Sequence, residues 1–186
     1  MIRNFAFLTI LCIASLAALA AEVGGVKLDD KATVGGQELV LNGAGIRTKF
    51  IVKVYVGSLY VPAKASTPAA VLAKGPRRVQ LNMLRDVGAD QMVEALVDGV
   101  NQGNPPAEAA AVKAQTDELA KIMKSIGELK QGNVLTFDFV DDATKVSLNG
   151  AAKGSIPGAA FNKALTNAWL GENPVQGDLK KAMLGG

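Results

Sequence analysis

The feature that most constrains the fold is the β-type stretch over residues 43–61, GAGIRTKFIVKVYVGSLYV. Apolar side chains recur there with a period of two, at Phe50, Val52, Val54 and Val56. The intervening positions carry cations and a phenol, at Arg47, Lys49, Lys53 and Tyr55. A period of two places alternate side chains on opposite faces of a strand. The pattern therefore predicts one long strand that closes a core on one face and can hold an anionic head group on the other.

The rest of the chain alternates between blocks of strands and blocks of helices. Strands are predicted over 37–41 and 46–60, paired across a turn at Gly43-Ala44-Gly45, then over 78–84, 134–140 and 145–148. Helices are predicted over 67–74, 90–100, from the Asn104 cap and Pro105 to a stop at Gly127, over 159–170 and over 177–184. This order predicts an α+β fold in which helices cover one face of an antiparallel sheet.

The N-terminus has the pattern of a secretory signal peptide. Arg3 precedes an apolar run, and Ala18-Leu19-Ala20 offers small residues for cleavage after Ala20. The alternative, a membrane anchor, is disfavoured because the run is shorter than the roughly 20 residues that span a bilayer. We expect a signal peptide over 1–20, a single domain over 21–186, a periplasmic or secreted location, and no stable membrane anchor after cleavage.

The residues that the chain lacks exclude several chemistries. It has no histidine, and its one cysteine, Cys12, lies in the predicted signal peptide. The mature chain should therefore have no disulfide, no imidazole base and no Cys-His or Ser-His nucleophile. The aspartate pairs in turns lack calcium-loop spacing, so no metal is expected. Gly43-Ala44-Gly45 lacks the third glycine of a dinucleotide-binding loop, and no cofactor is expected either. The formal charge of +3 is spread along the chain without a basic, aromatic stripe, so nucleic acid is not an expected partner.

Two motifs carry a resemblance to a known family. The first is GAGIR followed by KVYVGSLYV, and the second lies in residues 145–174, KVSLNGAAKGSIPGAAFNKALTNAWLGENP. In the second, a strand is followed by a GxIxG turn, Phe161 and the WLGxxP ending that begins at Trp169. In this order, over about residues 34–184, the motifs resemble the bacterial branch of the chalcone isomerase-like family. The resemblance implies an open-faced β-sandwich with a helical layer and a ligand cleft between sheet and helices.

The resemblance also suggests roles for two residues. Arg47 matches the family arginine that helps to hold a phenolate in the plant enzymes and a carboxylate in the fatty-acid-binding relatives. A planar guanidinium suits this role because it binds a carboxylate through two contacts and stays charged when desolvated. Tyr55 aligns near the threonine that polarises the ketone in isomerases, and its phenol could donate to a carboxylate. The plainer alternatives are an exposed arginine paired with a cross-strand acid and a half-buried core tyrosine.

Three further positions argue against the isomerase reaction. Isomerases carry a tyrosine, an asparagine and a threonine where this chain has Met92, Gly99 and Ala168. We therefore predict ligand binding by Arg47 and Tyr55, with no catalytic residue assigned, and a fatty acid or polyphenol-like ligand. Two alternatives stay open: an isomerase (intramolecular lyase) of chalcone-like enones with an unfamiliar residue set, and a structural or partner-binding module without a small ligand.

Overall fold

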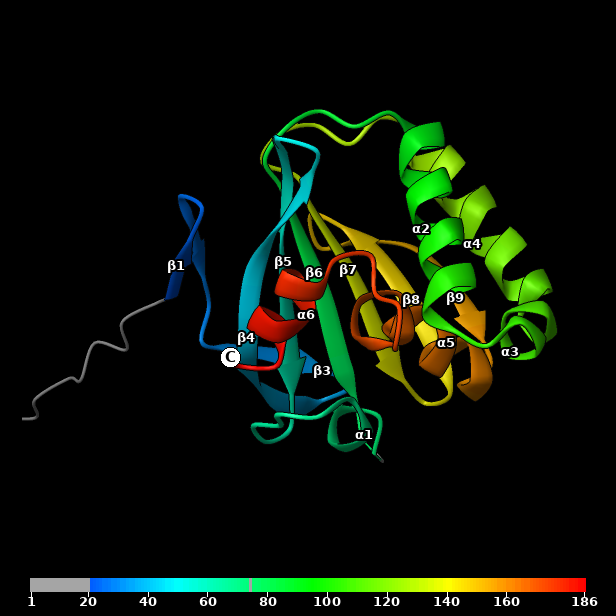
Figure 1. Cartoon of the computed structure of the whole chain (residues 1–186), viewed down its shortest axis with the longest axis horizontal. Helices are drawn as coiled ribbons and strands as arrows, with labels where there is room; N and C mark the ends of the chain where they lie inside the picture. Colours follow the sequence, from blue (N-terminus) through cyan, green and yellow to red (C-terminus); the bar gives the residue numbers. More distant parts are fainter. Residues whose placement is uncertain (1–20, 74) are drawn as a thin grey trace, which may run out of the picture.

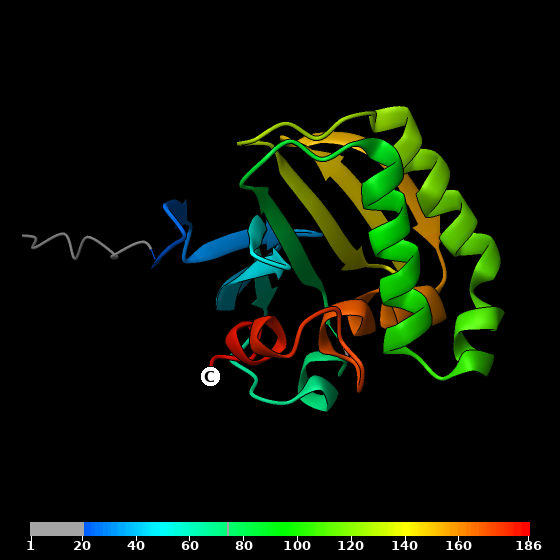
Figure 2. The ribbon, with the colours of Figure 1, turned by 45° about the horizontal axis from the view of Figure 1, so that its top comes forward.

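The computed structural model describes residues 21–73 and 75–186, so the predicted signal peptide lies outside the described residues. Seven strands form one antiparallel sheet in which each pairs with its neighbour in the sequence, in the order β3-β4-β5-β6-β7-β8-β9. The sheet curls, and the helices pack across its concave face (Figure 1, Figure 2). The predicted α+β class, with an antiparallel sheet covered by helices, is confirmed.

The strands are β1 (Ala21–Val23), β2 (Val26–Leu28), β3 (Lys31–Val34), β4 (Gln37–Lys49), β5 (Val52–Val61), β6 (Arg77–Met83), β7 (Val134–Val140), β8 (Ala143–Leu148) and β9 (Ala151–Pro157). The helices are α1 (Pro68–Val71), α2 (Ala89–Gly103), α3 (Pro106–Ala111), α4 (Lys113–Ile126), α5 (Ala159–Leu170) and α6 (Gly177–Met183). No helix among the described residues is long and apolar enough to cross a membrane.

The two faces of the sheet bury different apolar sets. The larger core lies between the sheet and the helices and contains Trp169, Phe137 and Met123, each at most 1% exposed. The smaller core lies on the other face, beneath the β1–β2 hairpin, and includes Val56 and Tyr60. Adjacent residues of β5 thus enter different cores, as the alternation of a strand requires.

The long predicted strand is in fact a hairpin. Strand β4 continues through Gly43-Ala44-Gly45, and the chain reverses at Phe50 and Ile51. Gly43 and Gly45 allow helix α6 to approach strand β4 closely and do not form a turn. A Cβ at Gly43 would lie 2.1 Å from the Ala182 carbonyl oxygen of α6. The predicted turn is therefore wrong, because these glycines let helix α6 sit directly on the sheet.

A β-bulge also changes which side chains share a face. Arg47 pairs with Tyr55 but Thr48 pairs with Lys53, so Val54 is an extra residue on β5. Strict alternation would have separated Val54 from Tyr55. Because of the bulge, both line the same cleft together with Arg47.

Asn104 ends one helix instead of opening the next. Its Nδ2 donates to the carbonyl oxygens of Val100 (2.8 Å) and Ala164 (2.9 Å), which ties the end of α2 to α5. The predicted helix from Asn104 to Gly127 is split into α3 and α4 at Val112. Gly127, with φ of 79°, ends α4 as predicted.

The GxIxG segment, predicted as a turn, is part of the edge strand β9. Gly154 pairs with Val146, and a Cβ at Gly154 would lie 2.5 Å from Cδ1 of Ile122. The glycine is thus needed because helix α4 packs closely against this strand. The glycines of this segment predict a turn, and the sequence pattern does not predict strand β9.

The arginine pair at the start of β6 is divided between core and surface. Arg78 forms an ion pair with Asp138, whereas Arg77 is buried and donates to Thr166 Oγ1 and to the Asn162 carbonyl, both at 2.9 Å. Burial lowers the pKa of Arg77 to about 10. Its guanidinium also lies 4.6 Å from the centre of the Phe139 ring.

Replacing Gly103 with alanine should destabilise the protein by about 1–3 kcal/mol, because an added Cβ would lie 2.2 Å from the Asn167 carbonyl oxygen of α5. The sign is opposite to the roughly 1 kcal/mol by which alanine favours a free helix. Urea denaturation measures the change. Gly177→Ala is the matched control, since nothing lies within 4 Å of a Cβ there. An equal effect of both substitutions would contradict the packing argument.

Candidate functional site

A cleft of about 390 Å³ lies between the sheet and the helices. Strands β4, β5 and β6 form one wall, helix α2 forms the facing wall, and the end of α5 with the loop before α6 closes the site. The lining is mainly apolar near its buried parts, where Leu81, Met92, Leu96 and Trp169 are each at most 4% exposed. A volume of this size and an apolar lining are typical of small-molecule sites.

Arg47 lies on the cleft wall and is half-buried. Its guanidinium donates to the Thr48 carbonyl oxygen and to Gln176 Oε1, the latter at 3.3 Å. Gln176, the N-cap residue of α6, also accepts from the Thr48 N–H and donates to the Ile46 carbonyl. Within the part of the chain that the structure describes, no carboxylate lies within 4 Å of Arg47. The alternative in which Arg47 pairs with an acid on the neighbouring strand is therefore wrong.

Tyr55 is the direct cross-strand partner of Arg47 and is 7% exposed. Its phenol oxygen accepts a hydrogen bond from Trp169 Nε1 at 3.1 Å. Among residues 21–73 and 75–186, no oxygen accepts a hydrogen bond from the Tyr55 hydroxyl. Because Trp169 acts only as a donor, the phenol proton is available to a ligand.

Burial keeps this phenol neutral. Desolvation raises the pKa of Tyr55 above 10.0, against the opposing effects of the Trp169 hydrogen bond and the nearby Arg47 guanidinium. At neutral pH the site therefore presents a charged guanidinium and a neutral O–H group side by side. Both are donors, which is the complement that a carboxylate or a phenolate requires.

The chain has only two tyrosines, and burial raises the pKa of both Tyr55 and Tyr60. We expect the native protein to show no phenolate absorbance step at pH 10, whereas the urea-unfolded protein titrates there. Since the unfolded chain releases these protons first, stability present below pH 10 should be lost as the pH rises further.

Ultraviolet titration of the wild type and of Tyr60→Phe checks this expectation. The variant assigns the remaining signal to Tyr55. A native step of full amplitude at pH 10 would mean that the phenols are solvated.

Charges of both signs line the mouth of the cleft. Lys49 and Arg85 lie on the sheet side, and Glu94 and Asp98 lie on α2. All four residues are exposed, and the Arg85 Nε donates to the carbonyl oxygen of Asp86 at 3.3 Å. The cations lie with Arg47 on the sheet wall, so an anionic group is favoured on that side of the cleft.

The three positions that differ from the isomerases all line this cleft. Met92 and Gly99 lie on α2, and Ala168 lies on α5. A Cβ at Gly99 would lie 2.9 Å from the Ala168 Cβ, so the two small residues let α2 and α5 approach closely. At these positions the wall offers no hydrogen-bonding side chain.

Sequence reasoning missed two residues of the site. In the sequence, Trp169 stands out only as part of a family motif, and no pattern points to Gln176. The signal for Trp169 was its status as the one tryptophan, since a buried indole needs an acceptor for its N–H. No local signal identifies Gln176, because its partners Arg47 and Thr48 are about 130 residues away in the sequence.

Comparisons with known proteins agree with the fold. A family model described as chalcone isomerase-like matches residues 20–185. The crystal structure of a fatty-acid binding protein from Arabidopsis thaliana is similar, with a TM-score of 0.66 and 10% sequence identity over 86% of this chain and 92% of that chain. At this identity the likeness shows the shared fold. No curated protein sequence matches the chain.

Proposed function

Because this chain belongs to the chalcone isomerase-like family, we propose that it is a non-catalytic protein that binds a fatty acid or a similar apolar carboxylate. The observation that carries the proposal is the pairing of Arg47 and Tyr55, two donors on adjacent strands, at the wall of an apolar cleft of about 390 Å³. The fold is shared with a protein described as fatty-acid binding, which supports the ligand class.

The carboxylate would be held by two donors of different kinds. The guanidinium supplies the charge, and the neutral phenol adds one hydrogen bond from a position fixed by Trp169. Leu81, Met92 and Leu96 would enclose the acyl chain, whose burial contributes about 0.8 kcal/mol for each methylene. Affinity should therefore rise with chain length until the cleft is full.

The same observations disfavour the two alternatives. An isomerase stabilises charge that develops in the transition state with several polar groups, and Met92, Gly99 and Ala168 supply none. A module without a small ligand would have this space filled by side chains, whereas here an open cleft contains Arg47. We also propose export to the periplasm, which rests on the signal-like pattern of residues 1–20.

Fluorescence offers a direct test because Trp169 is the one tryptophan and lines the cleft. Octanoate, dodecanoate and hexadecanoate should each change its emission in a saturable way, with tighter binding for the longer chains. Native mass spectrometry of the protein purified from its own source should detect the adduct that it carries. No emission change and a clean apo mass after incubation with all three acids would overturn the proposal.

A further inference from the structure

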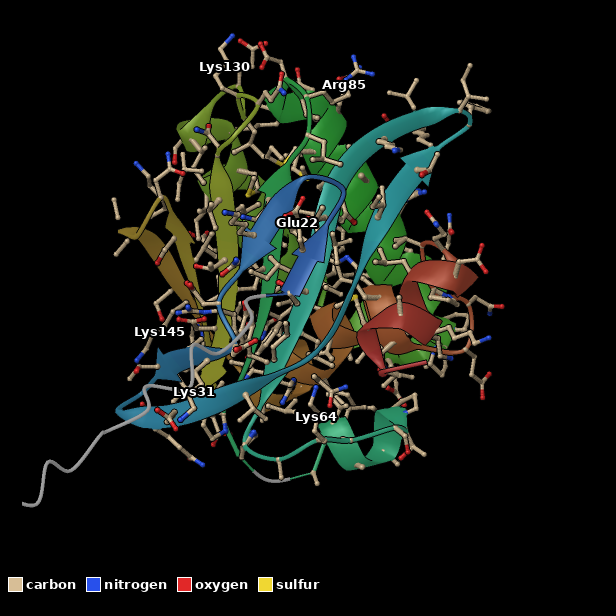
Figure 3. The ribbon with its side chains drawn as sticks, turned by 90° about the vertical axis from the view of Figure 1, so that its left-hand side faces the viewer. Glu22, Lys31, Lys64, Arg85, Lys130 and Lys145 are labelled. Carbon is tan, nitrogen blue, oxygen red and sulfur yellow. The ribbon has the colours of Figure 1, made fainter. Side chains whose placement is uncertain are left out.

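The tip of the β4–β5 hairpin carries exposed apolar side chains at the mouth of the cleft. Phe50 is 93% exposed, Ile51 is 94% exposed and Val52 is 40% exposed, and no other large apolar side chain of the described residues is classed as exposed. We call these three residues the hairpin tip. The hairpin projects at the end of the molecule that also carries Arg85 and Lys130 (Figure 3).

The stability of the fold does not explain why Phe50 and Ile51 occupy this turn. Phe50 is the first central residue of a two-residue turn and has a φ of 58°. Hairpins favour glycine at such a position, since a bulky side chain is strained there. A phenylalanine that is both strained and solvated contributes nothing to the stability of this fold, so an external contact is the better explanation.

The charges around the tip are predominantly positive. Residues 48–54 contain Lys49 and Lys53 and no carboxylate, and Arg85 lies on the same, sheet side of the cleft mouth. Within the described ranges, no carboxylate lies within 4 Å of these three cations.

Most carboxylates at this end of the molecule form ion pairs with lysines. Asp90 pairs with Lys124, and Asp86 and Glu128 pair with Lys130. The remaining carboxylates, Glu94 and Asp98, lie on the helix wall of the cleft.

We propose that the hairpin tip docks reversibly on a lipid bilayer that contains anionic headgroups. Apolar side chains flanked by lysines are the pattern that inserts into the headgroup region, with the cations against the phosphates. The tip consists of three consecutive residues, and its area is small compared with that of an ordinary protein interface. A tip of this size is better suited to insertion between lipids.

Docking here would place the cleft against the membrane. Phe50 and Val52 belong both to the tip and to the lining of the cleft. An acyl chain could then move between bilayer and cleft without crossing water. This transfer of an acyl chain rests on the proposed function, whereas the docking of the hairpin tip on a bilayer does not.

Flotation with vesicles tests the proposal. The purified protein should float with vesicles of phosphatidylcholine and phosphatidylglycerol, and much less with phosphatidylcholine alone or at high salt. Ile51→Asp should lower the binding by about tenfold or more, because an exposed side chain that inserts is replaced by a charge. Lys53→Glu should lower it by about tenfold on the anionic vesicles only.

The controls separate docking from ligand binding. Lys31→Glu makes the same charge change at a site remote from the tip (Figure 3) and should float like the wild type. Ile51 and Lys53 do not line the cleft, so their variants should bind dodecanoate like the wild type in the Trp169 assay. If the wild type does not bind dodecanoate, that result would count against the proposed function and not against docking.

Three outcomes would overturn docking. The wild type could fail to float with anionic vesicles at low salt, the tip variants could float like the wild type, or Lys31→Glu could lose as much binding as Lys53→Glu. In the first case, a soluble protein partner becomes the better explanation of the tip.

Discussion

Replacing Arg47 with alanine is expected to weaken dodecanoate binding by about 10- to 100-fold. Hydrogen bonds to a charged group typically contribute 1.5–3 kcal/mol, and each 1.4 kcal/mol is a factor of ten in affinity. The full effect is expected because no other arginine or lysine of the cleft pairs with Tyr55 across the strands. Titration of the Trp169 emission measures the dissociation constant.

Two further substitutions distinguish charge from geometry. Arg47→Lys keeps the positive charge but loses the planar fork, so its affinity should fall between those of the wild type and Arg47→Ala. Tyr55→Phe removes one neutral donor and should cost about 1 kcal/mol, or roughly fivefold. Octanol, which has no carboxylate, should bind all three variants and the wild type about equally.

Arg47 also has a structural role that the experiment must separate from binding. Its bond to Gln176 Oε1 helps to hold the start of α6 against β4. Gln176→Ala is therefore the matched control, since it disturbs the same contact and leaves the guanidinium in place. If Gln176→Ala weakens dodecanoate binding as much as Arg47→Ala does, Arg47 acts by positioning the loop and not by binding the carboxylate.

The sequence was sufficient for the elements whose signals are local. Helix α5 was predicted at its observed bounds because apolar spacing and flanking glycines mark it, and β7 was predicted at its observed bounds as the first half of a hairpin. The pairing of Arg47 with Tyr55 was not predictable in the same way. It depends on a turn at Phe50, where no turn residue stands, and on the bulge at Val54.

Glycine was the residue most often misread, for a single physical reason. A glycine with positive φ and a glycine under a close contact look identical in a sequence. Gly127 is of the first kind and ends its helix as predicted, whereas Gly43 and Gly154 are of the second kind, although the sequence pattern predicts turns at both. The element that presses on the glycine comes from a distant part of the chain, α6 for Gly43 and α4 for Gly154, so a local pattern cannot reveal it.

Trp169→Ala is expected to destabilise the protein by about 3–5 kcal/mol, the usual cost of deleting a buried large aromatic side chain. Trp169 is 1% exposed, and its ring centroid lies 5.7 Å from that of Phe137 at a tilt of 40°. The substitution would enlarge the cleft at its floor and leave the Tyr55 phenol without its donor. Urea denaturation followed by circular dichroism measures the loss.

Trp169→Phe separates the hydrogen bond from the packing. It keeps most of the apolar volume and removes the N–H, so the cost should be near the 0.5–1.5 kcal/mol of one hydrogen bond. In a double-mutant cycle with Tyr55→Phe, the two changes should be non-additive by a similar amount, because each breaks the same bond. Because these variants lack the tryptophan, native mass spectrometry replaces fluorescence as the readout of dodecanoate binding. Additive losses of stability would show that the indole stabilises the core without fixing Tyr55, and the phenol would then not be a preset donor for the carboxylate.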